Sequence, residues 1–518
     1  MNIYGAAELH SSFKSISNLF SASTIDKSID HTGFGAVGGI KLEDGSDWDE
    51  RGHKDRVIGI GNNELLLFSS LYDIEGTPAE QARLPALHTI QLVSVLEKFA
   101  EYPRRLGDLK GEYLSLEMWH ETNQQDDGTI RRETCFPVSP DEWVLSGPHF
   151  FVGTPLYKTP RAVCTEKGHY DPIDLTIIPD DYLPRTNYVP ACSPDEYRSR
   201  IPRVPWVEEG ESEGQRVTDF YRFVNRRMIS ISGERSLICS LIPPGTSHVN
   251  TVIGTTFKNE RVAVGLYGLC TSLVADFFLK SSAKADLYES TLKLFPLFDS
   301  DELIARSLSL ACLSSHYAAL WNRFQPTLSP RDGWSQLGFG INSAGPLGEG
   351  ATWSPASAVR MDYHRRLVML EIDVLAAREI NLDLEELLAI YRVQFPVMRQ
   401  YEAETFYDQT GRIIFTPSKG LSSVGLPRKA RPSDLKSSIH YGIQSDKRTE
   451  SNIALGWEDV RDMQSGTVTK TFMDDTLPDG PHERTIEYIA PFFRPDREED
   501  YRVAWEFFET RTANKDES

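Results

Sequence analysis

The sequence from Glu234 to Leu297 decides the fold that we expect for this chain. It opens with ERSLICSLIPPGTSHVNT (residues 234–251), in which an apolar run stops at a Pro-Pro-Gly turn. GLYGLCTSLVADFF (residues 265–278) follows, and LKLFPL (residues 292–297) closes the stretch. A run of about six to nine apolar residues bounded by Pro or Gly is typical of a buried strand, whereas a longer run favours a helix. The stretch therefore predicts a strand, a turn, a second strand, a buried helix and an extended exit.

Two further strings lie upstream, WVLSGPHF at residues 143–150 and PRTNY at residues 184–188. Together with the central stretch they resemble the target-recognition half of adenine-specific DNA methyltransferases. The likeness is greatest to the large type II restriction–modification methylases and to the methylase of the DISARM phage-defence system. That family carries an E-R-T-L-I…I-P-P-G…H-x-N-T block, a G-L-x-x-S…D-F-F-x-R/K helix and an L-x-x-F-P exit. Ser236 stands where the family has Thr, and the resemblance spans residues from about 60 to about 510.

The resemblance implies an α+β fold in which a mixed-strand recognition domain precedes a helical region and a small C-terminal α+β part. We expect a partly helical region at residues 1–140, which in the family follows the methylase core. The DNA target-recognition domain would occupy residues 141–300 and the helical region residues 301–400. Residues 401–518 would form the C-terminal part, with a basic loop at 417–433.

Several local patterns predict individual elements. His88 to Glu101 has the spacing of an amphipathic helix, and residues 359–390 form a long helical pattern whose second part starts at Asp383. A strand near Val468 to Phe472 and its return at Glu483 to Ile489 predict a hairpin, and Tyr501 to Glu509 a closing helix.

The 518 residues allow about two to four domains. Six scattered cysteines without a Cys-x-x-Cys pair indicate reduced thiols, and we expect a cytoplasmic protein that does not enter a membrane. A formal net charge of −20 argues against a surface that binds nucleic acid everywhere, but it leaves room for a localised basic cleft.

Two basic segments are candidates for such a cleft. Residues 217–228 predict a helix with Arg222, Arg226 and Arg227 on one face, which would contact phosphates or form a solvated face paired with Asp219 and Glu234. Residues 417–433 carry four basic residues and no acid, and their Gly, Ser and Pro content predicts a flexible loop. Such a loop either follows a phosphate backbone or only solubilises the surface.

The catalytic motifs of the family are not found in this sequence. An adenine methyltransferase needs a Gly-rich loop for S-adenosylmethionine and an (Asn/Asp)-Pro-Pro-(Tyr/Phe) loop that holds the extruded base. The only Pro-Pro pair, Pro243-Pro244, stands between Ile242 and Gly245. Gly33 to Gly38 matches G-x-G-x-x-G, but no apolar strand precedes it and no helical pattern follows, so we expect a plain loop.

Nuclease and metal sites are not predicted either. Asp108-Leu109-Lys110 and Asp434-Leu435-Lys436 each hold only the second half of a nuclease motif, and the histidines lack partners at ligand spacing.

The resemblance therefore implies sequence-specific binding of double-stranded DNA for an adenine-N6 methyltransferase, with the catalytic domain and its S-adenosylmethionine on another polypeptide or lost by truncation. Whether this chain is itself an enzyme stays open, and we expect no cofactor in it. A scaffold subunit of a defence complex and an inactive methylase fragment are the alternatives. Our candidate DNA contacts are Lys158, Arg161, Arg185, Asn187, Arg222, Arg226, Arg227, His248, Asn250, Lys258, Lys419, Arg428 and Lys429.

Overall fold

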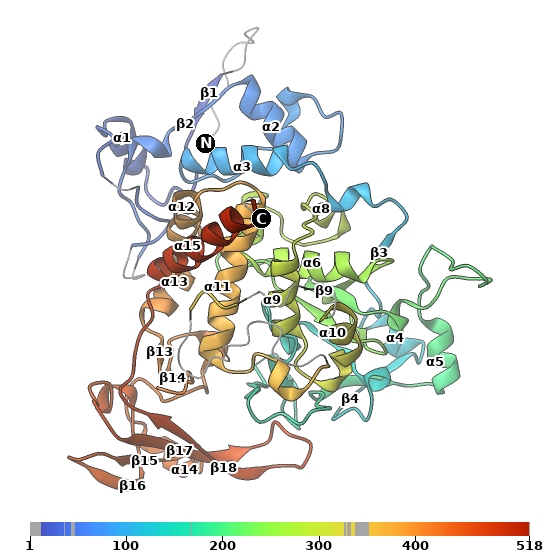
Figure 1. Cartoon of the computed structure of the whole chain (residues 1–518), viewed down its shortest axis with the longest axis vertical. Coiled ribbons are helices and arrows are strands. Elements are labelled where there is room, and N and C mark those ends of the chain that lie inside the picture. The colour runs from blue at the N-terminus through green and yellow to red at the C-terminus, as the bar shows by residue number, and fades with distance from the viewer. Residues whose placement is uncertain are drawn as a thin grey trace.

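The computed structural model of the chain describes residues 12–35, 37–42, 47–166, 168–325, 328, 333–336 and 352–516, with the backbone alone for 512–516. The fold is α+β, as predicted: several small antiparallel sheets surround a helical middle region, and a sheet and a helix end the chain. Figure 1 shows a helical N-terminal part at the top, the central helices below it, and the C-terminal sheet at the bottom.

The N-terminal part is built from short elements ahead of the central strands. These are β1 (Phe13–Ser15), α1 (Ser23–Ile29), η1 (Lys54–Arg56), β2 (Ile58–Ile60), α2 (Asn62–Tyr72), η2 (Ala79–Gln81), α3 (Gln91–Glu101) and η3 (Leu106–Asp108). The predicted amphipathic helix is confirmed as α3, because its face of Leu92, Val95, Leu96 and Phe99 is buried. The described residues of the Gly33 to Gly38 string form no helix or strand, and Ala36 lies outside the described residues.

The strand-rich part, residues 113–292, holds most of the short strands. Its elements are β3 (Tyr113–Leu116), α4 (Asn123–Asp126), β4 (Ile130–Cys135), η4 (Pro140–Glu142), β5 (Val144–Leu145), η5 (Gly147–His149), β6 (Lys158–Pro160), β7 (Tyr170–Pro172), β8 (Thr186–Pro190), α5 (Pro194–Arg200), η6 (Val217–Asp219), β9 (Arg222–Arg226), β10 (Cys239–Ile242), β11 (Ser247–His248), β12 (Val252–Phe257), α6 (Glu260–Thr271), α7 (Leu273–Ser281) and α8 (Glu289–Leu292).

The central sheet has the antiparallel order β10-β9-β12-β3. The predicted helix over residues 217–228 is therefore wrong, because this segment supplies the inner strand β9. Phe223 packs into the main hydrophobic core and Val224 into a second core on the opposite face of the sheet. A strand that is buried on both faces lacks the alternation of polar and apolar residues that marks a half-exposed strand, so its pattern resembles a helix.

The Pro-Pro-Gly turn is confirmed, and the structure shows why it needs glycine. Gly245 has φ +89°, and its N–H donates to the carbonyl of Thr218 at 2.7 Å. A Cβ there would lie 3.0 Å from the nitrogen of Asp141. A positive φ favours glycine, and the close approach leaves little space for a side chain. The turn leads into β11, which pairs in parallel with β5.

The predicted single helix after β12 is two helices, α6 and α7, bent by 75°. The bend lies at Ser272, whose hydroxyl accepts from the N–H of Ala275 at 3.1 Å and so caps α7. Among the described residues no single helix is long and apolar enough to cross a membrane. The bent pair of α6 and α7 has the length and composition of a membrane span, but it is largely buried in the core.

A buried ion pair joins two of the family-like strings. Asp276 on α7 accepts from Arg235 Nε at 2.7 Å and from the backbone N–H of Ser236 at 3.0 Å. The carboxylate also accepts from the N–H of Leu237 at 3.2 Å, and Arg235 donates further to the carbonyls of Thr271 and Ser272. Asp276 is fully buried and Arg235 is 6% exposed, so this part of the resemblance corresponds to a structural contact in the core.

The middle region is helical, as predicted. It contains α9 (Asp301–Ala311), η7 (Ser315–Tyr317), α10 (Ala318–Phe324), η9 (Pro355–Ser357), α11 (Asp362–Glu379), α12 (Leu384–Gln394) and α13 (Pro396–Ala403). The second part of the long pattern begins where expected, because Asp383 caps α12 by accepting from the N–H of Glu386 at 2.9 Å. The main hydrophobic core runs from Ile58 to Phe508 and crosses every predicted domain boundary.

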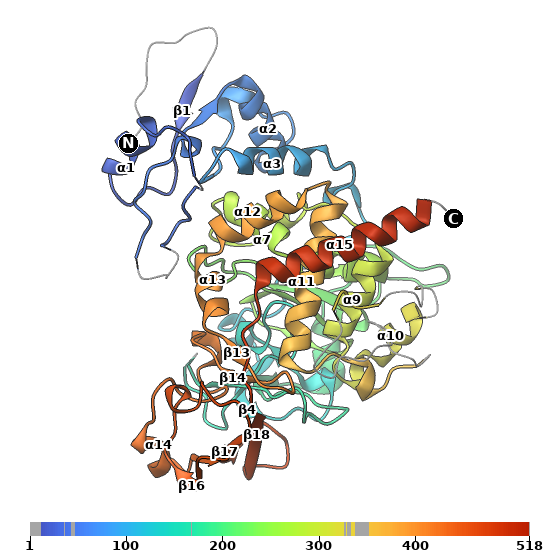
Figure 2. The same ribbon diagram turned by 60° about the vertical axis from the view of Figure 1, so that its left-hand side comes forward.

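The C-terminal part starts beside α13 and ends on the central helices. It contains β13 (Phe406–Tyr407), β14 (Ile413–Phe415), η10 (Lys419–Leu421), α14 (Pro432–Lys436), β15 (His440–Gln444), β16 (Thr449–Ile453), η11 (Trp457–Asp459), β17 (Thr467–Asp474), β18 (His482–Ile489) and α15 (Arg497–Asp516). The predicted hairpin is confirmed as β17 and β18 in a sheet of order β16-β15-β17-β18. The closing helix α15 lies across α11 in both Figure 1 and Figure 2.

Candidate nucleic-acid interface

The basic loop at 417–433 is held in place by the C-terminal core. The N–H of Leu426 donates to the carbonyl of Ile414 at 2.8 Å, and the N–H of Trp457 donates to the carbonyl of Pro427 at 2.8 Å. Leu426 itself is 3% exposed. A third backbone hydrogen bond runs from the N–H of Glu458 to the carbonyl of Arg428 at 3.1 Å. The segment is therefore tied to β14 and η11 and does not form the flexible loop that the sequence predicts.

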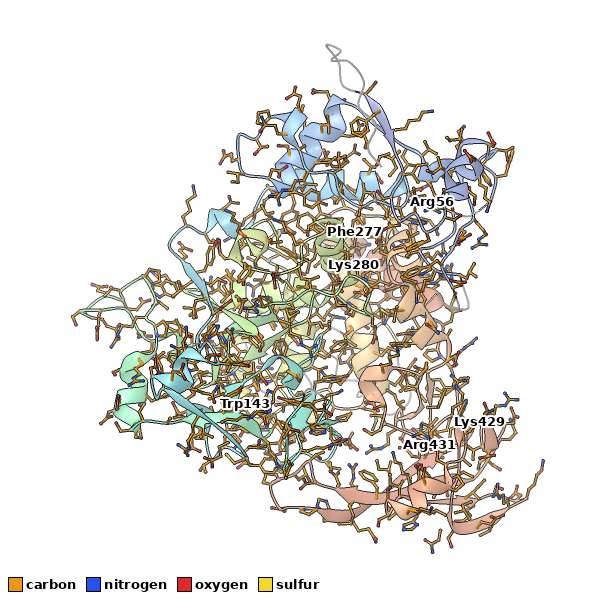
Figure 3. All side chains as sticks on the ribbon, turned by 180° about the vertical axis from the view of Figure 1, so that it is seen from behind. Arg56, Trp143, Phe277, Lys280, Lys429 and Arg431 are labelled. Atoms are coloured by element: carbon orange, nitrogen blue, oxygen red, sulfur yellow. The ribbon has the colours of Figure 1, made fainter. Side chains whose placement is uncertain are left out.

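The loop presents its charges outward. Figure 3 shows Lys429 and Arg431 beside the C-terminal sheet. Lys419, Arg428, Lys429 and Arg431 are all exposed, and Arg428 forms an ion pair with Glu404. No ion pair is found for the other three within the part of the chain that the structure describes, so they remain available for an external anion.

Two more candidates lie at β6, next to this loop. Gly420 packs against the hydroxyl of Tyr157, which brings the start of the basic loop to the start of β6. Lys158 is partly buried, and its ammonium lies 5.1 Å from the ring centroid of Tyr157. Burial lowers the pKa of Lys158, and the positive charge of Arg226 lowers it further. Arg161, at the end of β6, is exposed but paired with Asp171 at 2.8 Å.

Four candidates are buried and serve the fold in this structure. Arg222 is 1% exposed and donates to the carbonyl of Thr246, and burial lowers its pKa to about 9. His248 is fully buried, and burial together with the charge of Arg222 lowers its pKa to about 3, so the ring is neutral. Arg185 pairs with Asp475 at 2.7 Å, and Asn187 donates to the Tyr170 hydroxyl at 2.6 Å. All four residues are at least 90% buried, so they are not available at the surface.

Arg226 is the last residue of β9 and Arg227 follows it directly, and the two side chains have different partners. Arg226 donates to the carbonyls of Gly147 at 2.7 Å and Phe150 at 2.6 Å, and burial lowers its pKa to about 10. Arg227 pairs with Glu117 at 3.2 Å. These arginines therefore fasten β9 to neighbouring loops instead of forming the phosphate-contacting helical face that the sequence predicted.

Two candidates remain apart from the basic loop. Lys258 is exposed at the end of β12, and its backbone N–H donates to Glu112 beside β3. Asn250 is partly buried, with its side-chain oxygen 3.5 Å from the N–H of Glu121. In Figure 1, β3 lies well away from α14, which follows the basic loop, so Lys258 and the loop do not share one surface.

Sequence reasoning missed a charged cluster between β7 and the C-terminal sheet. Asp174 contacts Arg412 at 2.8 Å and also pairs with Arg484, which in turn reaches Asp474 at 3.0 Å. Burial raises the pKa of Asp174, but the two arginines outweigh it and lower the value to about 2. The cluster fastens the C-terminal sheet to the strand-rich part, residues 113–292, and its members are too far apart in the sequence to be grouped by spacing.

A cavity also escaped prediction. It opens between the segment Phe151–Tyr157, helices α11 and α13, and the residues from Ile413 to Val424, and its empty volume is about 1280 Å³ including the mouth. Glu234 and Asp362 line it, together with the rings of Tyr157, Tyr401 and Tyr407. A neighbouring cavity shares Pro172, Ile173 and Asp362 with it and continues toward the C-terminal sheet.

No group of three or more His, Cys, Asp or Glu side chains that could hold a metal ion is found in the described ranges. The chain matches no protein-family model, and no curated protein matches it. The resemblance to adenine-specific methyltransferases therefore rests on the sequence strings themselves.

Proposed function

We propose that this chain is the DNA-recognising part of an adenine-N6 methylation system of the restriction–modification or phage-defence kind, and that a separate methylase polypeptide supplies the catalytic site and S-adenosylmethionine. The DNA-binding half of this proposal rests on one observation. In a chain of net charge −20, a firmly anchored loop exposes three cations, Lys419, Lys429 and Arg431, for which the described residues provide no ion pair, and the Lys419 end of this loop lies next to Tyr157.

Anchoring matters because a pre-positioned cation loses little conformational freedom when it meets a phosphate. Phosphate contacts fix the register of a protein on a duplex, while base contacts carry the specificity. The methylation half of the proposal is supported by the resemblance of the strings at 143–150, 184–188 and 234–297 to the recognition domains of that family.

The experiment that tests DNA binding is a salt titration with mixed-sequence duplex DNA, read by fluorescence anisotropy. We compare the wild-type chain with Lys419→Glu/Lys429→Glu and with a control of equal charge change, Lys54→Glu/Lys293→Glu. Both control lysines are exposed, and the described contacts give neither of them an ion pair. Each lost phosphate contact should reduce the slope of log K against log salt by about 0.9.

The proposal expects a steep salt dependence that the first variant weakens and the control leaves unchanged. Equal losses in both variants would mean that only net charge matters, and would contradict a defined interface. Arg226→Glu is not a useful test, because the buried guanidinium holds two backbone carbonyls and its reversal would disrupt the fold.

A second candidate, a scaffold subunit that does not read bases, is favoured by a different observation. The N-terminal part exposes several large apolar side chains, among them Phe34 at 85%, Ile74 at 84% and Ile29 at 58%. Exposed apolar side chains are typical of protein–protein contacts when they gather into one patch. This reading predicts no salt-dependent DNA binding in the same titration.

A further inference from the structure

We infer that residues 406–493, here called the C-terminal module, open as a rigid body away from the strand-rich part. The module turns about a hinge where the chain enters and leaves it, and ion pairs at the opposite end of the interface hold it closed. The structure describes the closed state. This motion is independent of the proposed function, because neither the hinge nor the ion pairs require DNA.

The module has a hydrophobic core of its own. Ile414, Trp457 and Val468 are among the buried side chains of this core. Among the described residues, the main hydrophobic core has no member between Met398 and Tyr501. The sheet of the module lies below the central helices in Figure 1 and Figure 2. A segment of this size with a separate core has the character of a domain, and domains move relative to one another unless their interface is large and hydrophobic.

The hinge consists of two neighbouring segments through which the chain enters and leaves the module. Tyr407 and Phe493 exchange two backbone hydrogen bonds of 2.9 Å. The guanidinium of Arg494 donates to the carbonyl of Ala403 at 3.1 Å. The ring of Tyr363 on α11 contacts the rings of Tyr407 and Phe493, with centroids 5.3 and 5.2 Å apart. Hinges are typically a few residues at the ends of elements, and these paired segments keep the pivot in one place.

The opposite end of the interface is held by charges. Asp174 of the strand-rich part pairs with Arg412 and Arg484 of the module. Arg185, also in the strand-rich part, pairs with Asp475 in the turn between β17 and β18 at 2.7 Å. Ion pairs gain little net free energy over their separated and hydrated groups, because desolvation offsets the attraction. This end of the interface can therefore open at modest cost, provided that both partners reach water.

The packing at this end is incomplete. Leu477, in the turn between β17 and β18, is 9% exposed and belongs to the second core, next to Tyr182. Behind it lies a cavity with an empty volume of about 1180 Å³ including its mouth, lined by Asp174 from one side and by Lys470 from the other. Protein interiors normally leave few voids larger than a water molecule. The interface is therefore packed less tightly than either core, and Leu477 reports whether it is closed.

Opening would change the surroundings of the basic loop, because this loop belongs to the module. Gly420 packs against the hydroxyl of Tyr157 in the closed state, and opening would separate the two residues. The two neighbouring cavities, which share Pro172, Ile173 and Asp362, would then be open to solvent. The hinge therefore sets the distance between the basic loop and the strand-rich part.

Hydroxyl-radical footprinting read by mass spectrometry measures the opening, because Leu477 is protected from solvent only in the closed state. Trp457 is the internal reference, since it lies in the module's own core and stays protected in both states. Asp174→Asn leaves Arg412 and Arg484 without their carboxylate in the closed state. This variant should raise the oxidation rate of Leu477 at least fivefold and leave that of Trp457 unchanged.

A second variant and a matched control complete the test. Asp475→Asn removes the partner of Arg185 from the module side and should also raise the oxidation rate of Leu477. Asp171→Asn makes the same change of charge, but Asp171 pairs with Arg161 inside the strand-rich part, so Leu477 should stay protected.

Three outcomes would overturn the inference. Equal rises at Leu477 and Trp457 would mean that the module unfolds instead of moving as a rigid body. Protection of Leu477 in both Asp174→Asn and Asp475→Asn would mean that the interface does not open. A rise in Asp171→Asn as large as in Asp174→Asn would mean that net charge matters and the ion pairs across the interface do not. Because the footprinting contains no DNA, a failed DNA titration leaves its result standing, and the reverse holds as well.

Discussion

Replacing Asp276 by Asn should destabilise the protein strongly, because it breaks the buried pair that joins the two family-like strings. The carboxylate is fully buried and accepts from Arg235 and from the backbone N–H groups of Ser236 and Leu237. Removing one partner of a buried ion pair leaves an uncompensated charge and costs about 3–5 kcal/mol. That is a large fraction of a typical folding free energy of about 5–15 kcal/mol.

Urea unfolding followed by tryptophan fluorescence measures this loss. Asp299→Asn serves as the control, because Asp299 pairs with Arg261 but its side chain is 64% exposed, and exposed pairs contribute at most about 1 kcal/mol. The double variant Arg235→Met/Asp276→Asn should lose less stability than the two single variants added together, since it also removes the guanidinium that Asp276→Asn leaves without its ion-pair partner. A loss in Asp276→Asn no larger than in the control, or single losses that add within about 0.5 kcal/mol, would refute this reasoning.

Three further outcomes are expected. Gly254→Ala should cost about 1–3 kcal/mol in thermal unfolding, because a Cβ would overlap the ring of His248, whereas Gly59→Ala, with nothing within 4 Å, should cost nothing. The pKa of Asp174 is lowered to about 2, so its carboxylate stabilises the fold fully above about pH 5 and loses this effect as the pH falls toward 2. The stability advantage of the wild type over Asp174→Asn should therefore be about 2 kcal/mol at pH 6 and vanish near pH 2; a constant difference would contradict it. Lys470→Met should weaken DNA binding although it removes no exposed charge. The buried ammonium of Lys470 donates to the carbonyls of Ser423 at 2.7 Å and Gly425 at 2.8 Å and so holds the basic loop in place. Unchanged DNA affinity in this variant would show that the position of the loop does not matter for DNA binding.

The sequence predicted the elements that bury only one face, because apolar residues recur in them at a regular spacing. Helix α3 and the β17–β18 hairpin each bury one face, so apolar residues recur at the spacing of the element. Strand β9 was missed because both of its faces are buried, and the bend at Ser272 was missed because the apolar run continues across it.

Candidate site residues were predicted less well, for a different physical reason. Charge and residue type mark a possible contact, but burial decides whether it is available, and burial depends on the tertiary fold. Arg222 and Arg185 carry the charge expected of phosphate contacts, yet one holds a backbone carbonyl and the other Asp475, 290 residues away. Glu234 belongs to a motif string in the sequence, and its position at the cavity follows from segments that are far apart in the chain.

The central claim is tested most directly by an adenine-N6 methylation assay with S-adenosylmethionine and mixed-sequence duplex DNA. The purified chain is assayed alone, the methylase polypeptide encoded beside it is assayed alone, and the two are assayed together. The account predicts no methylation by this chain alone, and methylation confined to one short sequence only when both polypeptides are present. Methylation of the same sites by the partner alone, or by this chain alone, would contradict it.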